Sequence, residues 1–335
     1  QMMVDAGVEV LFHAWAAQVS MEDSRIKALF VETKSGRQAV LAKSFIDCSG
    51  DADVAAFAGV PYETGDGQGS GLYPTTMFRL ANVNPEAAMA AVGDFQAINV
   101  LMKKVQAEKP GAYQFPREGA ILRPQKNPSE WRANVTQIAQ ANGCAMDATN
   151  ARQLSQGELE GRHQIGEFFR FLKNEVPGFA QANITEIAPQ VGIRESRRIQ
   201  GVYALTGDDI LNCASFKDSI GCSAWPMEMH AQGKIEWQFP LQAQGAYQRL
   251  YNDLPWRMLV PQTVSNLLVA GRCASMTHEG QSAARVSGGC FVMGQAAGTA
   301  AAYSNDLSMF QNQDIAILQQ RLIRDGCYLE LEQIS

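Results

Sequence analysis

Apolar and polar residues alternate with a period of two in two short runs near the start of the chain. These runs lie at residues 8–12 and 26–30, and the apolar pair Val40-Leu41 follows a turn at Ser35-Gly36. Such alternation is typical of strands that bury one face, so the sequence predicts a small antiparallel meander. In front of it, residues 2–6 followed by Gly7 predict the end of a helix, because glycine commonly closes the last turn.

Two later stretches each combine a short apolar strand, a glycine-containing turn and a helix. The first has a strand at residues 44–48, the turn Ser49-Gly50-Asp51 and a helix over residues 52–59. The second has a strand at residues 266–270, then Gly271-Arg272, a loop over 273–287 and a helix over 290–303. In α/β sheets, ligands bind at the carboxyl ends of strands and at the N-termini of the helices that follow. Both stretches are therefore predicted cofactor-handling sites.

The middle of the chain has a different pattern. Helical periodicity covers residues 85–107 and 147–175, and strand-like or turn-like sequence covers 190–205 and 225–239. The fold class expected is α/β, with a second, α+β domain at residues 62–257 inserted into the first. The first domain then consists of residues 1–61 and 258–305, and residues 306–335 form a closing helical segment.

Composition excludes several classes of function. The chain is 46% hydrophobic and 19% charged, and its net charge of −6 argues against non-specific binding of nucleic acid, which needs clustered Lys and Arg. It has no apolar run of about 20 residues, the length that spans a bilayer, and residues 1–10 lack the pattern of a signal peptide. The seven cysteines form no Cys-x-x-Cys pair. We therefore expect a cytoplasmic protein with reduced thiols and no structural metal.

Three stretches of the chain resemble the FAD-dependent oxidoreductase family of two-domain flavoproteins. They lie at residues 45–55, at 191–203 with Trp225-Pro226 and His230, and at 266–298. They are distantly similar to the glutathione-reductase and fumarate-reductase flavoproteins, with Cys48-Ser49 and Ala52 as departures. The resemblance implies FAD as cofactor. It also implies an FAD/NAD(P)-binding, glutathione-reductase-like Rossmann-type domain with an inserted α+β substrate domain.

The family's Gly-x-Gly-x-x-Gly loop, which binds the pyrophosphate of FAD, has no counterpart in this sequence. Residues 65–71 are rich in glycine, but no apolar strand precedes them. Tyr73-Pro74 follows where the helix should begin. The FAD-binding domain is therefore expected to be incomplete at its N-terminus.

The resemblance places several residues near FAD. Ser49, Gly50 and Asp51 resemble a turn beside the adenosine end, although Ser and Asp also cap helices. Val19 is a candidate for backbone contact with the adenine, and a role in the core of the meander is the alternative. Arg272, after Gly271, suits a pyrophosphate or a carboxylate; a surface ion pair is the other interpretation.

The start of the last long helix is the predicted flavin site. Gly288 and Gly289 would let a ring system lie against bare backbone, and the helix N-terminus would stabilise negative charge on the reduced ring. Arg285 precedes them. A plain helix start, with glycine present for packing, is the alternative.

Four residues are candidates for catalysis. His278 lies in the loop before the flavin helix and could exchange a proton with substrate. Arg194 and Arg197 belong to the densest basic cluster, and an arginine binds a carboxylate through two parallel hydrogen bonds. Arg197 and Arg198 are neighbours on a predicted strand and must point to opposite faces. His230 is a weaker candidate on the same reasoning.

The function expected is hydride transfer between flavin N5 and a small substrate, and the arginines suggest that this substrate is anionic. The electron donor or acceptor is unknown. Two alternatives stay open, namely a flavin-dependent monooxygenase reaction and a cofactor-free fragment that acts as a structural or interaction module.

Overall fold

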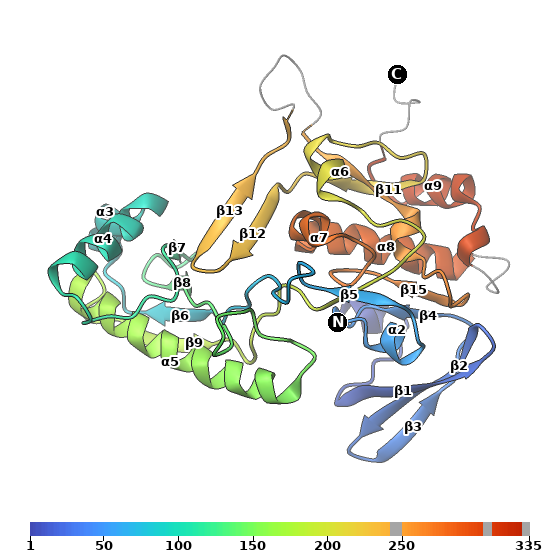
Figure 1. The fold of residues 1–335 in the computed structure, drawn as a ribbon, viewed down its shortest axis with the longest axis horizontal. Coiled ribbons are helices and arrows are strands. Elements are labelled where there is room, and N and C mark those ends of the chain that lie inside the picture. The colour runs from blue at the N-terminus through green and yellow to red at the C-terminus, as the bar shows by residue number, and fades with distance from the viewer. Residues whose placement is uncertain (242–249, 304–309, 330–335) are drawn as a thin grey trace. The chain divides into compact units, whose positions relative to one another are not determined.

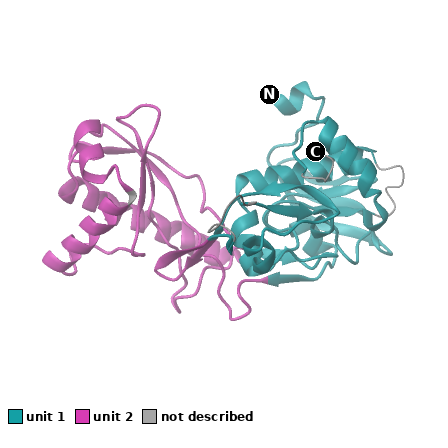
Figure 2. Ribbon diagram, turned by 90° about the horizontal axis from the view of Figure 1, so that it is seen from above, with its two compact units in different colours: residues 1–63, 197–227, 239–335 teal, residues 64–196, 228–238 magenta. Residues whose placement is uncertain are grey.

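The computed structural model describes residues 1–241, 250–303 and 310–329, and the chain divides into two compact units of mixed α/β structure (Figure 2). Unit 1 comprises Gln1–Glu63, Arg197–Met227 and Phe239–Ser335, and unit 2 comprises Thr64–Ser196 and Glu228–Gln238. Unit 2 is narrower than the inserted domain expected at residues 62–257, because residues 197–227 pack within unit 1.

The predicted meander is present, but its first strand was placed wrongly. Unit 1 opens with α1 (Met2–Asp5), and the antiparallel sheet follows as β1 (Ala14–Glu22), β2 (Arg25–Thr33) and β3 (Gly36–Val40). Residues 8–12 alternate in sequence, yet all of them are exposed and none is in a strand. The strand begins at residue 14, where side chains such as Val19 pack into a buried cluster.

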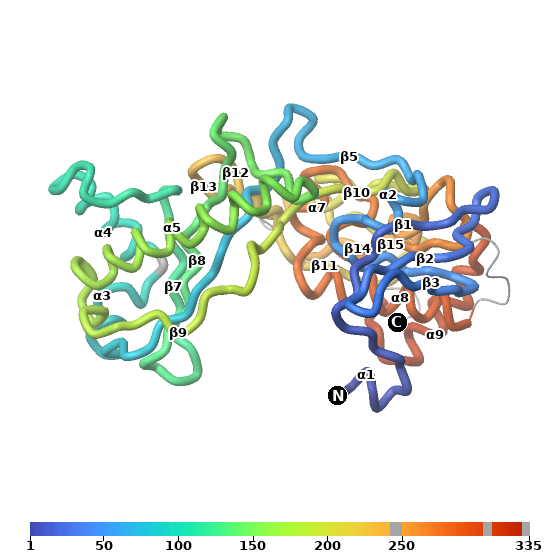
Figure 3. Tube along the Cα trace, turned by 90° about the horizontal axis from the view of Figure 1, so that it is seen from below, coloured from blue at the N-terminus to red at the C-terminus, as the bar shows by residue number. Residues whose placement is uncertain are grey.

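The centre of unit 1 is a pair of parallel strands, β4 (Phe45–Asp47) and β15 (Leu267–Val269), with α2 (Asp53–Phe57) after β4. Phe45 lies opposite Leu267, and Asp47 opposite Val269. Figure 3 shows the blue meander and orange β15 side by side, although they are far apart in sequence. The buried side chain of Asn266 joins them, because its Oδ1 accepts from Ile26 N at 2.9 Å and its Nδ2 donates to Ile26 O at 3.0 Å.

The rest of unit 1 includes the helix α8, which contacts β11, α9 and η2 (Figure 1). Its elements are β5 (Tyr62–Thr64), β10 (Arg197–Ile199), α6 (Gly207–Leu211), β11 (Ser219–Ser223), β14 (Asn252–Pro255), η2 (Trp256–Leu259), α7 (His278–Ala284), α8 (Ser287–Tyr303), η3 (Phe310–Asn312) and α9 (Ile315–Arg324). The loop expected over residues 273–287 contains α7, because Thr277 caps a helix by accepting from Gly280 N at 3.1 Å. The predicted closing helix corresponds to α9, whereas residues 306–309 and 330–335 lie outside the described part of the chain.

Unit 2 is built on a four-stranded antiparallel sheet in the order β7-β8-β6-β9. Its strands are β6 (Phe78–Ala81), β7 (Ile121–Pro124), β8 (Trp131–Asn134) and β9 (Asn183–Ile187). The single helix predicted over residues 85–107 is in fact two, α3 (Pro85–Val92) and α4 (Phe95–Glu108). Gly93 ends the first, and Asp94 starts the second by accepting a hydrogen bond from Gln96 N at 2.9 Å.

The long helix α5 (Ala151–Glu175) covers this sheet, and a hairpin of β12 (Met227–Ala231) and β13 (Lys234–Gln238) completes unit 2 (Figure 1). The helix begins at residue 151 rather than 147, because the Asn150 side chain accepts from the amides of the first turn. It buries one face of small and aromatic residues, namely Gly157, Gly161, Ile165, Phe168, Phe171 and Leu172. Among the described residues, no helix has the length and apolarity needed to cross a membrane.

Close packing at Gly161 yields a stability prediction. A Cβ at Gly161 would overlap the buried Thr76 Oγ1 and lie 3.2 Å from Ile138 Cδ1, whereas Gly166 in the same helix has nothing within 4 Å. We expect Gly161→Ala to lower the free energy of unfolding by about 1–3 kcal/mol through overpacking. Gly166→Ala should instead raise it by about 0.5–1 kcal/mol, because alanine favours helix. Urea unfolding of both variants measures this, and equal effects would contradict the packing assigned to α5.

Candidate functional site

The turn after β4 is organised by the buried carboxylate of Asp47, which is 1% exposed. Its Oδ1 accepts from Ser49 N at 2.9 Å, and its Oδ2 accepts from Ala55 N at 3.0 Å. One side chain thus fixes both the turn and the first turn of α2. Sequence reasoning did not single out Asp47, although an acidic residue that ends an apolar strand just before Ser-Gly was a usable signal.

The turn after β4 and the turn after β15 are joined by Arg272. We call residues 48–52 and 270–275 the paired turns. Arg272 Nη2 donates to Asp51 Oδ1 at 2.8 Å, and the guanidinium lies directly against the backbone of Gly50. Gly50 has φ of +77°, and a Cβ there would overlap Arg272 Nη1. Ser49 Oγ accepts from Asp53 N at 3.0 Å and from Asp51 N at 3.3 Å. The structure therefore brings four predicted cofactor residues together.

Arg197, which was a candidate for catalysis, contacts the first of the paired turns. Its Nε donates to Asp51 O at 2.7 Å, and its Nη2 pairs with the Asp53 carboxylate. Burial raises the pKa of Asp53, and the charge of Arg197 opposes that rise. Arg198 lies on the other face of β10 and donates to Met276 O at 3.0 Å, so the predicted opposite orientation of the two arginines is confirmed.

Unsatisfied polar atoms lie beside the paired turns. Within the described residues, Arg272 Nε and Gln281 Oε1 are buried and have no hydrogen-bond partner. Gln281 Nε2 donates to the backbone oxygen of Arg272 at 2.9 Å, so the two residues are in direct contact. Buried polar atoms without partners are uncommon in folded proteins, and a bound water, an ion or a further group can account for them.

The start of α8 has an open backbone position and a closed one. Gly288 is exposed, and nothing lies within 4 Å of where its Cβ would stand. Gly289 is buried, and a Cβ there would overlap Ala284 O. The two glycines therefore serve different purposes: Gly289 permits close packing on α7, whereas Gly288 leaves bare backbone accessible at the N-terminus of a 17-residue helix.

The remaining candidates of unit 1 have varied surroundings. Gly271 has φ of +96°, a conformation that favours glycine, and Cys290 Sγ lies 3.8 Å from where its Cβ would stand. Arg285 ends α7, and its carbonyl accepts from Cys290 Sγ at 3.1 Å. His278 is the first residue of α7 and is half-buried. Val19 is buried in the core cluster beneath the meander, which matches the alternative interpretation of that residue.

Arg194 and His230 lie in unit 2, and both contact the backbone of Tyr73. Arg194 Nη1 donates to Tyr73 O, and His230 O accepts from Tyr73 N at 3.1 Å. Both side chains are buried, and His230 Nε2 lies 3.0 Å from Glu228 Oε1. These contacts hold the backbone of Tyr73 in place. The sequence pattern could not distinguish this structural role from the predicted role in substrate binding.

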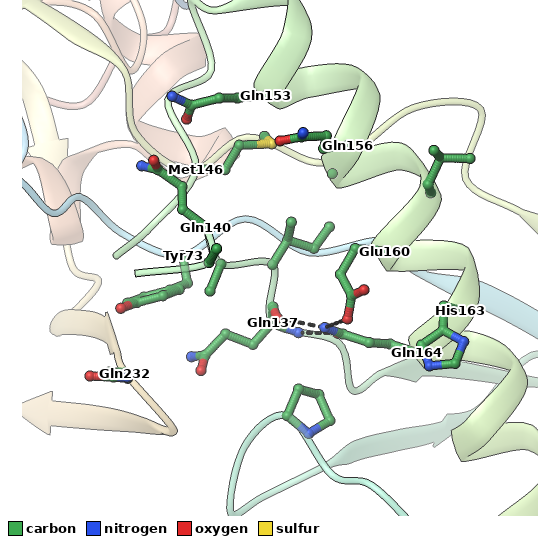
Figure 4. A pocket seen from close by; sticks show the side chains of 16 residues that line it. Tyr73, Gln137, Gln140, Met146, Gln153, Gln156, Glu160, His163, Gln164 and Gln232 are labelled. Atoms are coloured by element: carbon green, nitrogen blue, oxygen red, sulfur yellow. Dashed lines mark hydrogen bonds between the residues drawn. The ribbon is translucent and has the colours of Figure 1, made fainter. Parts of the chain in front are cut away.

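A cavity of about 720 Å³ in unit 2 is lined by α5 and the segments facing it (Figure 4). Its lining is rich in amides, with the glutamines 137, 140, 153, 156, 164 and 232. Gln164 Nε2 donates to Glu160 Oε1 at 2.8 Å and to Gln137 O at 2.9 Å. Glu160 and His163 are its titratable acid and base, and its described lining holds neither lysine nor arginine. Sequence reasoning did not predict this cavity.

Comparison with protein families and with curated proteins gave one match and one negative result. A family model described as FAD dependent oxidoreductase matches residues 1–322 of the chain. A search of curated proteins found no match.

Several solved structures are similar to this chain at low identity. A geranylgeranyl bacteriochlorophyll reductase-like protein from Thermoplasma acidophilum is 14% identical over 97% of this chain and 56% of that chain, with a TM-score of 0.41. MibH, a lathipeptide tryptophan 5-halogenase, is 10% identical over 96% of this chain and 39% of its own, with a TM-score of 0.39. The p-nitrophenol 4-monooxygenase PnpA from Pseudomonas putida DLL-E4 is 12% identical over 58% and 40%, with a TM-score of 0.32. The chain thus spans at most 56% of the length of these three proteins.

Removal of the Asp47 carboxylate tests its role in the turn. We expect Asp47→Ala to lower the free energy of unfolding by about 3–6 kcal/mol, since one buried and one part-buried amide lose a charged acceptor at about 1.5–3 kcal/mol each. Asp47→Asn keeps one acceptor oxygen and should lose about half as much. Urea unfolding gives these values, and amide hydrogen exchange should accelerate at Ala55 in both variants. Unchanged exchange at Ala55 would show that the carboxylate does not hold α2.

Proposed function

Because the chain belongs to the FAD dependent oxidoreductase family, we propose that it catalyses the two-electron oxidation or reduction of a small organic substrate. FAD, when bound, supplies the acceptor or donor of hydride at its N5 atom. The match of the family model over residues 1–322 is the observation that carries this proposal.

We infer that unit 1 is the FAD-binding domain, of the glutathione-reductase-like Rossmann type, and that unit 2 is the substrate domain. The residues of unit 1 fit FAD on two observations. Arg272 Nε and Gln281 Oε1 are buried polar atoms that lack partners among the described residues, and Gly288 leaves open space at a helix start. An arginine donor and a helix N-terminus are both suited to the anionic parts of a dinucleotide.

Four residues in or near the paired turns have a role in this proposal. Arg272 would hold the pyrophosphate or another anionic group, and Gly50 lets its guanidinium lie close to the backbone. Arg197 acts as a positioning residue, because it bonds Asp51 and Asp53 and so fixes the turn that bonds Arg272. Gly288, with the first turn of α8, would face the ring system and stabilise negative charge on it.

His278 is the proposed proton carrier of unit 1. It is the first residue of α7 and is half-buried, so the residue keeps part of its surface accessible to solvent. A neutral imidazole accepts and returns protons near neutral pH, which suits the proton that accompanies a hydride.

The reaction type is tested by anaerobic reduction. With FAD bound, an oxidisable substrate should bleach the visible flavin absorbance without oxygen, and the product should lack two hydrogen atoms and gain no oxygen atom. If turnover requires oxygen and mass spectrometry shows one added oxygen atom, the reaction is a hydroxylation and hydride removal from the substrate is refuted. If the protein binds no FAD, the cofactor-free alternative takes its place.

The role of Gly50 gives a matched pair of variants. Gly50 and Gly59 have nearly the same backbone angle, with φ of +77° and +76°, but only Gly50 has a neighbour in the space of a Cβ. Backbone strain from alanine is therefore equal, and Gly50→Ala additionally displaces Arg272. We expect Gly50→Ala to weaken FAD binding at least tenfold relative to Gly59→Ala. A factor of about ten corresponds to the loss of one charge-assisted hydrogen bond from Arg272 to the cofactor. Titration of flavin fluorescence measures this, and equal affinities would remove Arg272 from the cofactor site.

A further inference from the structure

A second cavity of unit 2, of about 540 Å³, differs in charge from the amide-lined one. We call it the basic cavity. Its lining comes from α4, the segment before β7, and β13, and consists of Gln96, Asn99, Lys103, Arg117, Glu118, Gly119, Ala120, Ile121, Lys234, Ile235 and Trp237. Its volume lies within the range of about 300–1,000 Å³ that is typical of small-molecule sites.

Arg117 is the most informative residue of the basic cavity. It lines the cavity but is only 4% exposed, so its charge is largely withdrawn from water. Its Nη2 donates to the carbonyl and the side-chain oxygen of Asn134, whereas its Nε is buried and has no hydrogen-bond partner among the described residues. Burial lowers the pKa of Arg117 to about 10, against the opposing charge of Glu228, so the guanidinium is still protonated at neutral pH.

Two lysines add to the positive charge of the cavity. Lys103 lies on the exposed face of α4 and makes no ion pair with a described residue, whereas Lys234 pairs with Glu236 on β13. The lining thus carries three cationic side chains and one carboxylate, that of Glu118. This excess contrasts with the net charge of −6 on the whole chain and with the other cavity, whose described lining has no lysine or arginine.

The lining of the basic cavity also includes apolar residues. They are Ile235 and Trp237 on β13, with Ala120 and Ile121, and Trp237 is 42% exposed. An exposed indole beside cationic side chains suits a ligand with a flat apolar body and one anionic end. Arginine in particular matches the two oxygens of a carboxylate.

We propose that the basic cavity binds a small organic carboxylate, with the carboxylate at Arg117 and Lys103 and the apolar body against Trp237. The site goes beyond the proposed function, because none of its residues belongs to the paired turns and binding there needs no flavin.

The test is calorimetric titration of the flavin-free protein with benzoate and with benzamide, which has the same shape without the charge. We expect benzoate to bind at least tenfold more tightly than benzamide and to change the fluorescence of Trp237, a change that Trp237→Phe removes. Because Arg117 is buried and Arg117→Met risks misfolding, the decisive variant is on the rim. Lys103→Glu should weaken benzoate about tenfold.

Lys104→Glu is the matched control. Lys104 is also exposed on α4 but outside the cavity lining, so this variant changes the net charge equally and should alter affinity less than twofold. Equal binding of benzoate and benzamide, no heat of binding at millimolar benzoate, or equal effects of Lys103→Glu and Lys104→Glu would each overturn the proposal. A failure here leaves FAD binding by unit 1 unaffected, so the two ideas are tested separately.

Discussion

A buried carboxylate that must be satisfied by backbone amides is the constraint on which the paired turns depend. Asp47 ends β4 inside the protein, where an unpaired charge is costly. The backbone amides of Ser49 and Ala55 donate hydrogen bonds to its carboxylate. Those two bonds determine how sharply the chain turns and where α2 begins. The positive φ of Gly50 and the approach of Arg272 follow from that turn. The candidate cofactor residues are thus held by a side chain that need not touch a cofactor.

Local pattern predicted much of unit 1, and its failures have physical causes. The strands at β2, β4 and β15 and the glycine turns after them followed from short-range chemistry. Residues 8–12 alternate as well as a real strand does, but alternation gives a strand only where a sheet and a core lie beside it. The helix predicted over residues 85–107 was divided because Asp94 bonds the next helix's amide directly after Gly93. Local capping there outweighed a helical hydrophobic period.

The candidate site was less predictable, because its bonds join residues far apart in sequence. Resemblance identified Asp51 and Arg272, but only the fold shows that they form an ion pair across 221 residues. The arginines at 194, 197 and 198 looked like one basic cluster, yet they serve three different backbone or carboxylate partners in two units. Arg117 had no distinguishing pattern, since its burial and its cavity are created by α4 and β13, which are distant in sequence.

The Asn266 side chain has a consequence for the order in which the molecule is made. The backbone N and O of Ile26 both bond the side chain of Asn266, which is 240 positions later in the chain. Asn266 Nδ2 also donates to Lys43 O at 3.3 Å. Unit 2 is complete in sequence once residue 238 has left the ribosome, because it comprises Thr64–Ser196 and Glu228–Gln238. The meander precedes unit 2 in the chain, yet it cannot be joined to Asn266, the residue before β15, until residue 266 has been made. A segment translated before unit 2 is therefore fastened only after all of unit 2 is available to fold.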